Sequence, residues 1–197
     1  RCAVLHLLPF SRSELAGQRP MDIEKVGATK RRASADDEDP FTSILTGGYP
    51  RIHDKHLDPQ EWLANYYQTY LERDARDVLN IGDLESLGRF IRLCAGRCGQ
   101  LLNLSSLATD CGISHTTARR WLSALEASFL VYLLRPHHRN FSKRLIKSPK
   151  LYVLDSGLLC YLLGIRSAED LRIHASRGAV FESWVVAEAL KAYYHQG

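Results

Sequence analysis

The chain has 197 residues, of which 45% are hydrophobic and 24% are charged, and its formal net charge is +4. This composition is typical of a folded globular protein, so a chain that is disordered throughout is excluded. The sequence contains no run of about 18 apolar residues, the length that a membrane helix needs, and His6 and Pro9 interrupt its apolar start. We therefore expect neither a membrane span nor a signal peptide, and no membrane partner.

The five cysteines are scattered along the chain, at positions 2, 94, 98, 111 and 160. An odd number without regular spacing is typical of reduced thiols in a cytoplasmic protein rather than of a disulfide scaffold. Cys94 and Cys98 lie four residues apart on one apolar helix face, and no second pair of ligands accompanies them. We therefore predict buried cysteines at these positions rather than a zinc site, and we expect no metal site elsewhere.

Both ends of the sequence indicate a piece of a longer protein. The chain begins with Arg1 and contains a single methionine, Met21. Residues 2–8 form a short apolar run that fits a buried strand, and one strand implies a sheet formed with other residues. Gly197 follows a periodic stretch, where a helix would pass to the next element. Residues 17–40 are polar with runs of both charges, which predicts a linker or an insertion.

Two amphipathic helices are predicted after this linker. Asp58, Pro59 and Glu61 form a helix start, and aromatic residues spaced by four continue that helix to about residue 79. Asp83 opens the second helix, whose apolar residues recur at intervals of three and four until Gly99 closes it. We predict that both helices pack their apolar faces into a core.

Residues 105–127 form the most informative segment, which reads as two short helices around a tight turn. Ser105 is predicted to cap the first helix, Gly112 to make the turn and Ser114 to cap the second helix. The predicted inward face of the second helix consists of Ala118, Trp121, Leu122 and Leu125. Its outward and flanking positions carry residue types that suit phosphate and base-edge contacts: His115, Thr116, Thr117, Arg119 and Arg120.

Two strands with a long basic connection follow, where the wing of a winged helix belongs. Residues 128–134 and 151–154 are the predicted strands, and no acidic residue occurs between Glu126 and Asp155. The connection supplies four candidate phosphate contacts, which are Arg139, Lys143, Arg144 and Lys147. A basic wing beside an arginine-bearing helix favours duplex DNA as the partner. The alternative is that the same surfaces contact a protein partner or a second copy of the chain.

Helices are predicted for the rest of the chain. Asp155 caps an apolar helix that stops at Gly164, Ser167 begins a short turn or helix, and a long helix follows Gly178.

Eight stretches, in order along nearly the whole chain, resemble a prokaryotic family of AAA-type ATPases with an uncharacterised C-terminal domain, made of a winged helix and a restriction-endonuclease-like fold. Residues 16–40 depart from the family pattern. The matching stretches are residues 5–15 (LHLLPFSRSEL), 47–50 (GGYP), 67–74 (YQTYLERD), 101–103 (LLN), 114–117 (SHTT), 147–152 (KSPKLY), 155–159 (DSGLL) and 177–182 (RGAVFE).

The resemblance implies ATP and Mg²⁺ as cofactors of the parent protein, but not of this chain. The string G-x-x-x-x-G-K-[ST], which cradles nucleotide phosphates, does not occur in the sequence, so we expect no ATPase activity from the chain alone. Arg1, Arg73 and Arg76 match positions that could face nucleotide. Glu182 matches an acidic position of the nuclease-like fold, for which a surface or ion-paired glutamate is the alternative reading.

The sequence therefore predicts a mainly α fold with a small β wing, in which a winged helix-turn-helix and a helical lid-like region lie between the incomplete ends of flanking α/β domains. The expected divisions are residues 1–16 (end of the AAA core), 17–40 (linker), 41–98 (lid-like region), 99–164 (winged helix) and 165–197 (start of the nuclease-like domain). We expect a part that couples ATP turnover to DNA or to a protein partner. A stand-alone winged-helix transcriptional regulator is the alternative, and a nuclease would need carboxylates and a lysine that the sequence lacks.

Overall fold

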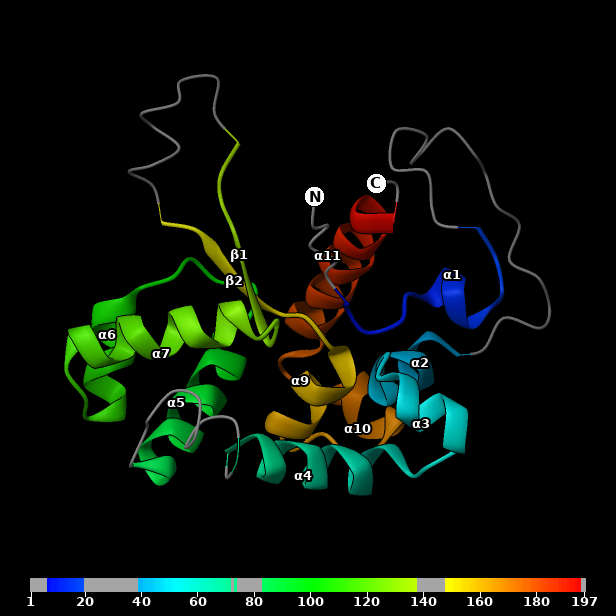
Figure 1. Ribbon diagram of the computed structural model, residues 1–197, viewed down its shortest axis with the longest axis horizontal. Helices are drawn as coiled ribbons and strands as arrows, with labels where there is room; N and C mark the ends of the chain where they lie inside the picture. Colours follow the sequence, from blue (N-terminus) through cyan, green and yellow to red (C-terminus); the bar gives the residue numbers. More distant parts are fainter. Residues whose placement is uncertain (1–6, 20–38, 72, 74–82, 138–147, 196–197) are drawn as a thin grey trace, which may run out of the picture.

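Helices make up most of the part of the chain that the structure describes. The computed structural model describes residues 7–19, 39–71, 73, 83–137 and 148–195. Within these residues, a two-stranded antiparallel sheet accompanies the helices, as Figure 1 shows. The protein is therefore mainly helical with a small antiparallel sheet, as the sequence predicted. The elements are α1 (Arg12–Leu15), α2 (Pro40–Thr46), α3 (Pro50–Lys55), α4 (Pro59–Thr69), α5 (Leu84–Gly96), α6 (Leu104–Cys111), α7 (His115–Ala127), β1 (Val131–Leu134), β2 (Lys150–Val153), α9 (Ser156–Leu162), α10 (Ala168–Ile173) and α11 (Arg177–His195).

Side-chain caps begin most of the longer helices. A capping oxygen accepts the backbone N–H three residues further on, which satisfies a donor that the helix itself cannot pair. The sequence predicted five of these helix starts, and the structure confirms them at Asp58, Asp83, Ser114, Asp155 and Ser167.

The sequence placed several other boundaries wrongly, including those of β2, which covers residues 150–153 rather than 151–154. Asn103, not Ser105, caps α6, because its side chain accepts the N–H of Ser106 at 3.0 Å. β1 begins at Val131 rather than at residue 128, because Ser128 still belongs to the end of α7 and Phe129 has a left-handed φ of 57°. α5 ends at Gly96, three residues before the predicted stop at Gly99.

Other predicted features lie partly or wholly outside the described residues. Of the predicted leading strand, only residues 7 and 8 are described, and they have no regular structure. Most of the predicted linker and the end of the helix expected to reach residue 79 also lie outside the described ranges. In the ranges that are described, no helix combines the length and the apolar character needed to cross a bilayer.

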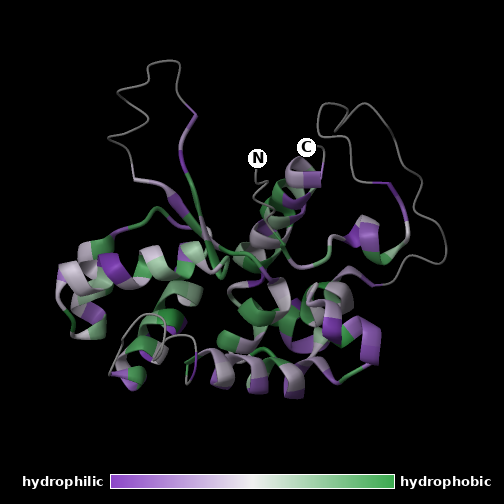
Figure 2. Ribbon diagram, viewed as in Figure 1, coloured by the Kyte–Doolittle hydropathy of each residue, from purple (hydrophilic) through white to green (hydrophobic). Residues whose placement is uncertain are grey.

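The core is one continuous cluster of buried side chains, which runs from Ile44 in α2 to Val180 in α11. α9 lies at its centre and contacts α2, α4, α5, α11 and β2. Figure 2 shows α9 as mostly hydrophobic, whereas the outer side of α4 is hydrophilic. Cys94 and Cys98 belong to this core with 1% and 2% exposure, so the prediction of buried cysteines is confirmed.

A buried polar link ties four distant segments together beside the core. The N–H of Gly48 donates to Oδ2 of Asp155 at 2.8 Å, and the N–H of Phe10 donates to the carbonyl of Gly48 at 2.7 Å. Nζ of Lys191 in α11 then donates to the carbonyl of Phe10 at 2.9 Å. This link holds the loop between α2 and α3 against the start of α9, and it joins the segment before α1 to both.

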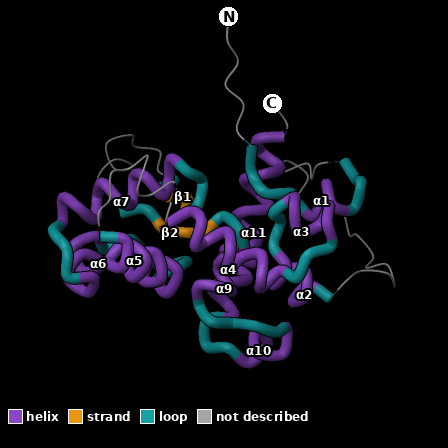
Figure 3. The backbone as a smooth tube through the Cα atoms, turned by 60° about the horizontal axis from the view of Figure 1, so that its bottom comes forward, coloured by secondary structure: helices purple, strands orange, loops and turns teal. Residues whose placement is uncertain are grey.

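Figure 3 shows how these elements divide the molecule. α5, α6 and α7 lie at one end, α1, α2 and α3 lie at the other end, and the strands with α4, α9 and α11 lie between them. The two ends therefore present separate surfaces.

Candidate nucleic-acid interface

α6 and α7 are joined by a tight turn that sequence chemistry explains. Gly112 follows α6 with a left-handed φ of 73°, a conformation that glycine adopts without strain. The N–H of Ile113 returns to the carbonyl of Ala108 at 3.0 Å, and Ser114 then caps α7 by accepting the N–H of Thr117 at 3.0 Å. The predicted turn and the predicted bounds of the second helix are both confirmed.

The buried face of α7 fixes which side chains the helix presents outward. Ala118, Trp121, Leu122 and Leu125 are buried, as predicted, and the ring of Trp121 meets Phe90 of α5 edge to face at a centroid distance of 5.6 Å. These contacts anchor α7 on α5 and prevent its rotation. The opposite face of α7 is therefore set by packing rather than by its own polar residues.

The outward residues of α7 lie largely where the sequence placed them. His115, Thr116, Arg119 and Arg120 are exposed. Thr117 is only half exposed, and its hydroxyl lies 2.9 Å from the hydroxyl of Ser114 at the cap. Four of the five predicted contact residues of α7 thus share an exposed surface, whereas Thr117 is occupied by the helix cap.

The hairpin of β1 and β2 is extended by a short segment that precedes α6. β1 pairs antiparallel with β2, with Val131 opposite Val153. On the other edge of β2, the N–H of Gly99 donates to the carbonyl of Leu151 at 2.7 Å, and the N–H of Leu151 donates to the carbonyl of Gln100 at 3.1 Å. Residues 99–102 therefore act as a third, short strand beside β2, a feature that the sequence analysis missed because its pairing partners lie about fifty residues away.

The sequence placed the basic wing in the connection between β1 and β2, residues 135–149. Arg135 and His137, which follow β1, are exposed. The other predicted contacts in this connection lie outside the described residues, and so do two of the predicted nucleotide-facing arginines. These residues are Arg139, Lys143, Arg144, Lys147, Arg1 and Arg76.

Arg73, the third predicted nucleotide-facing arginine, lies just beyond α4. It is exposed and already interacts within the protein. Three residues before it, the hydroxyl of Tyr70 lies 3.3 Å from Ser128, the residue that ends α7. The structure therefore brings Tyr70, at the end of α4, to the C-terminal end of α7.

Glu182 joins α11 to strand β2. Its Oε1 accepts the hydroxyl of Tyr152 at 2.6 Å and Nζ of Lys150 at 2.9 Å, both from β2. The hydrogen bonds from Tyr152 and then from Lys150 lower the pKa of Glu182, and burial with the hydrogen bond to Glu182 raises the pKa of Tyr152 to about 12. Glu182 thus forms an ion pair with Lys150 and links α11 to β2, and the match to the nuclease-like fold stays a prediction.

Replacement of Glu182 by glutamine is expected to lower the free energy of unfolding at pH 7 by less than about 1 kcal/mol, because this half-exposed ion pair is well solvated. The native pKa of Glu182 is lowered, so its stabilising contribution is present above the ordinary glutamate pKa and is lost as the pH falls through the lowered value. Urea unfolding at a series of pH values checks this. A difference between the proteins that persists at the acid end, or an equal pH-dependent difference for the exposed Glu169→Gln control, would contradict it.

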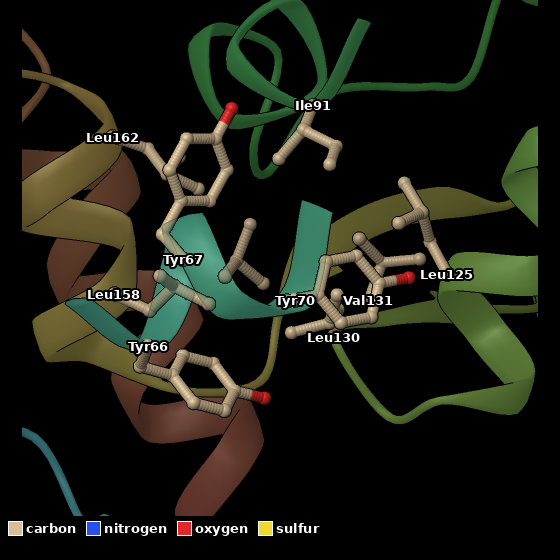
Figure 4. Close-up of a pocket in the computed structure, with 10 residues that line it drawn as sticks. Tyr66, Tyr67, Tyr70, Ile91, Leu125, Leu130, Val131, Leu158 and Leu162 are labelled. Carbon is tan, nitrogen blue, oxygen red and sulfur yellow. The ribbon is translucent and has the colours of Figure 1, made fainter. Parts of the chain in front are cut away.

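A narrow apolar gap lies where α4, α5, α7, β1 and α9 meet, and Figure 4 shows its lining. Its volume is about 10 Å³, and Tyr66, Tyr67 and Tyr70 turn their hydroxyl groups away from it. The hydroxyl of Tyr67 donates instead to the carbonyl of Gly88 at 3.2 Å. A space of this size holds at most one water, so the gap is a packing irregularity rather than a ligand site.

Comparison with known proteins adds a family and two relatives. Residues 37–169 match a family described as "Domain of unknown function (DUF8612)". The chain is also similar to the uncharacterized protein Rv2008c of Mycobacterium tuberculosis and to the uncharacterized protein Mb2031c of Mycobacterium bovis, with 32% identity over 184 residues in each case. The alignment covers 92% of this chain but 41% of each relative, so the chain spans about two fifths of their length. No solved structure matches the chain.

Proposed function

This chain belongs to the family described as the domain of unknown function DUF8612, and on that premise we propose that it is a non-catalytic DNA-binding module built on a winged helix. The greater length of its relatives supports a role inside a longer protein. The motifs that resemble AAA-type ATPases support an ATP-binding protein as that parent, with ATP and Mg²⁺ held outside this chain. The module would then couple nucleotide turnover to DNA.

The order of elements is the observation that carries the proposal. After α5 come the segment 99–102, the helices α6 and α7, and the hairpin of β1 and β2, in that order. The segment 99–102 is hydrogen-bonded to β2. A pair of helices around a tight turn, framed by a small sheet, is typical of a winged helix. In helix-turn-helix proteins the second helix of the pair enters the major groove, and here that helix is α7.

The chemistry of the exposed residues favours nucleic acid as the partner. Arg119 and Arg120 present guanidinium groups on the face of α7 opposite its packed side, and Arg135 directly follows β1. Arginine pairs with phosphate through two parallel hydrogen bonds and reads guanine in the same way. The free N–H groups and the positive dipole end at the start of α7 add a second attraction for phosphate.

We expect the chain to bind a fluorescently labelled duplex in anisotropy titrations at low salt. Combined replacement of Arg119 and Arg120 by alanine should weaken this binding on the order of tenfold to a hundredfold, because two charge-assisted contacts are lost. The matched control removes two exposed arginines from other surfaces, Arg51→Ala with Arg89→Ala, and should leave the affinity within about twofold of the wild type. Equal losses in both double variants, or no binding by the wild type, would refute the proposal.

A protein partner is the second candidate contact, and exposed apolar side chains of α11 favour it. Phe181, Val185, Tyr193 and Tyr194 are between 41% and 68% exposed on this helix. Large exposed apolar side chains that gather on one element are typical of surfaces that another protein covers. Failure of the wild type to bind duplex would favour this reading.

A further inference from the structure

An open cleft of about 720 Å³ lies between α1, α2 and α3. These helices lie at the end of the molecule away from α7 (Figures 1 and 3). Small-molecule sites have volumes of about 300 to 1,000 Å³. The side chains that line the cleft and bear on its chemistry are Arg12 and Ser13 of α1, Ser43 and Thr46 of α2, His53 of α3, and His56, which follows α3. This group could not be found from the sequence, because no short motif contains residues from all three helices.

The lining of the cleft is basic and hydroxyl-bearing. One arginine, two histidines, two serines and a threonine contribute to it, and none of its described lining residues is an aspartate or a glutamate. Two carboxylates near α1 accept hydrogen bonds from within the protein. Glu14 accepts from Ser11 at 2.7 Å and lies 3.4 Å from His195, and Glu188 accepts the backbone N–H of Arg12 and Nζ of Lys191.

The two histidines are held on one side of the cleft by the local fold. They are spaced by three residues, which places both on the same face of a helical turn. Nε2 of His53 donates to the carbonyl of Gly47 at 2.9 Å, so the ring is oriented and its other nitrogen is not used by that bond. His56 has a left-handed φ of 49° at the end of α3, and this bend turns the chain at the cleft's edge.

We propose that this cleft binds a small molecule that carries a phosphate group. Phosphate oxygens accept hydrogen bonds from guanidinium, imidazole and hydroxyl groups, and the described lining residues offer these groups with no carboxylate among them. The site is separate from α7 and from the hairpin, so it does not rest on the DNA-binding function proposed above. It gives the module a ligand of its own.

Isothermal titration calorimetry with inorganic pyrophosphate tests this site. The wild type should bind pyrophosphate and not succinate, because two carboxylates have the charge but not the oxygen geometry of a diphosphate. Arg12→Gln and His56→Asn should each weaken binding about tenfold. Asparagine tolerates the left-handed φ of residue 56, so a folding defect is avoided there. The control Arg51→Gln removes an exposed arginine on α3 that does not line the cleft, and it should bind as the wild type does.

Three results would overturn the proposal. The first is no heat of binding at millimolar pyrophosphate, and the second is equal weakening by the Arg51→Gln control. The third is a loss of duplex DNA affinity in Arg12→Gln or His56→Asn comparable to the loss of pyrophosphate affinity, since the cleft would then be part of a nucleic-acid surface. Because the cleft variants leave α7 unchanged, failure of this site and failure of the DNA-binding function give different patterns of results.

Discussion

Replacement of Asp155 by alanine is expected to lower the free energy of unfolding by about 3 kcal/mol or more. The carboxylate is 2% exposed, and it accepts the N–H of Gly48 and the N–H of Leu158, each at 2.8 Å. Alanine would leave both donors buried without partners and would remove the cap of α9, and α9 is the centre of the core. Urea unfolding at pH 7 measures the loss.

Asp155→Asn is the matched control, because asparagine keeps the shape and one acceptor oxygen. We expect a loss of about 1 to 2 kcal/mol, smaller than that of alanine. Burial raises the pKa of Asp155. Its contribution to the free energy of unfolding is therefore fully present below the ordinary aspartate pKa, and it declines as the pH rises through the raised value. The asparagine variant lacks this decline. An alanine variant that loses less than the asparagine variant would contradict the role of the link.

Replacement of Gly47 by alanine is expected to destabilise the protein by at least about 3 kcal/mol. Gly47 has φ 73° and ψ −167°, a combination that essentially only glycine adopts. A Cβ at this position would also lie 2.4 Å from Oδ1 of Asp155, which is itself fixed by two backbone donors. Backbone strain and steric overlap therefore act together, and thermal unfolding followed by circular dichroism measures their sum.

Gly96→Ala serves as the control for this substitution. Gly96 ends α5, and a Cβ there would meet no atom within 4 Å. Alanine at such a site is expected to be neutral or to stabilise the protein by up to about 1 kcal/mol, because it restricts the unfolded chain. A Gly47→Ala protein that melts within a few degrees of the wild type, as the control should, would show that the loop at Gly47 rearranges freely.

Local signals made the helix starts predictable from the sequence. A cap such as Asp58 or Ser114 accepts an N–H three residues away, so both partners lie within one short stretch of sequence. The same locality explains the failure at residue 105, since Asn103 is an equally good cap two residues earlier and only the folded chain decides between them. Strand β1 was predicted too long because apolar residues near Phe129 fit a strand and a buried turn equally well.

The parts that sequence reasoning missed depend on contacts between distant residues. Gly48 and Asp155 belong to two motifs that the sequence analysis noted separately, but 107 positions separate them, and no periodic pattern joins them. The cleft likewise collects side chains from three short helices, none of which was predicted. Glu182 was singled out by resemblance, whereas its contacts with Lys150 and Tyr152 come from the packing of α11 on β2.

The salt dependence of duplex binding tests most directly the claim that α7 and the hairpin contact DNA. Each phosphate contact contributes about −0.9 to the slope of log K against log salt concentration. We predict a steep negative slope for the wild type, and a slope that is smaller in magnitude by about 2 when Arg119 and Arg120 are both alanine. An unchanged slope in that variant, or no binding by the wild type at about 50 mM salt, would contradict the account.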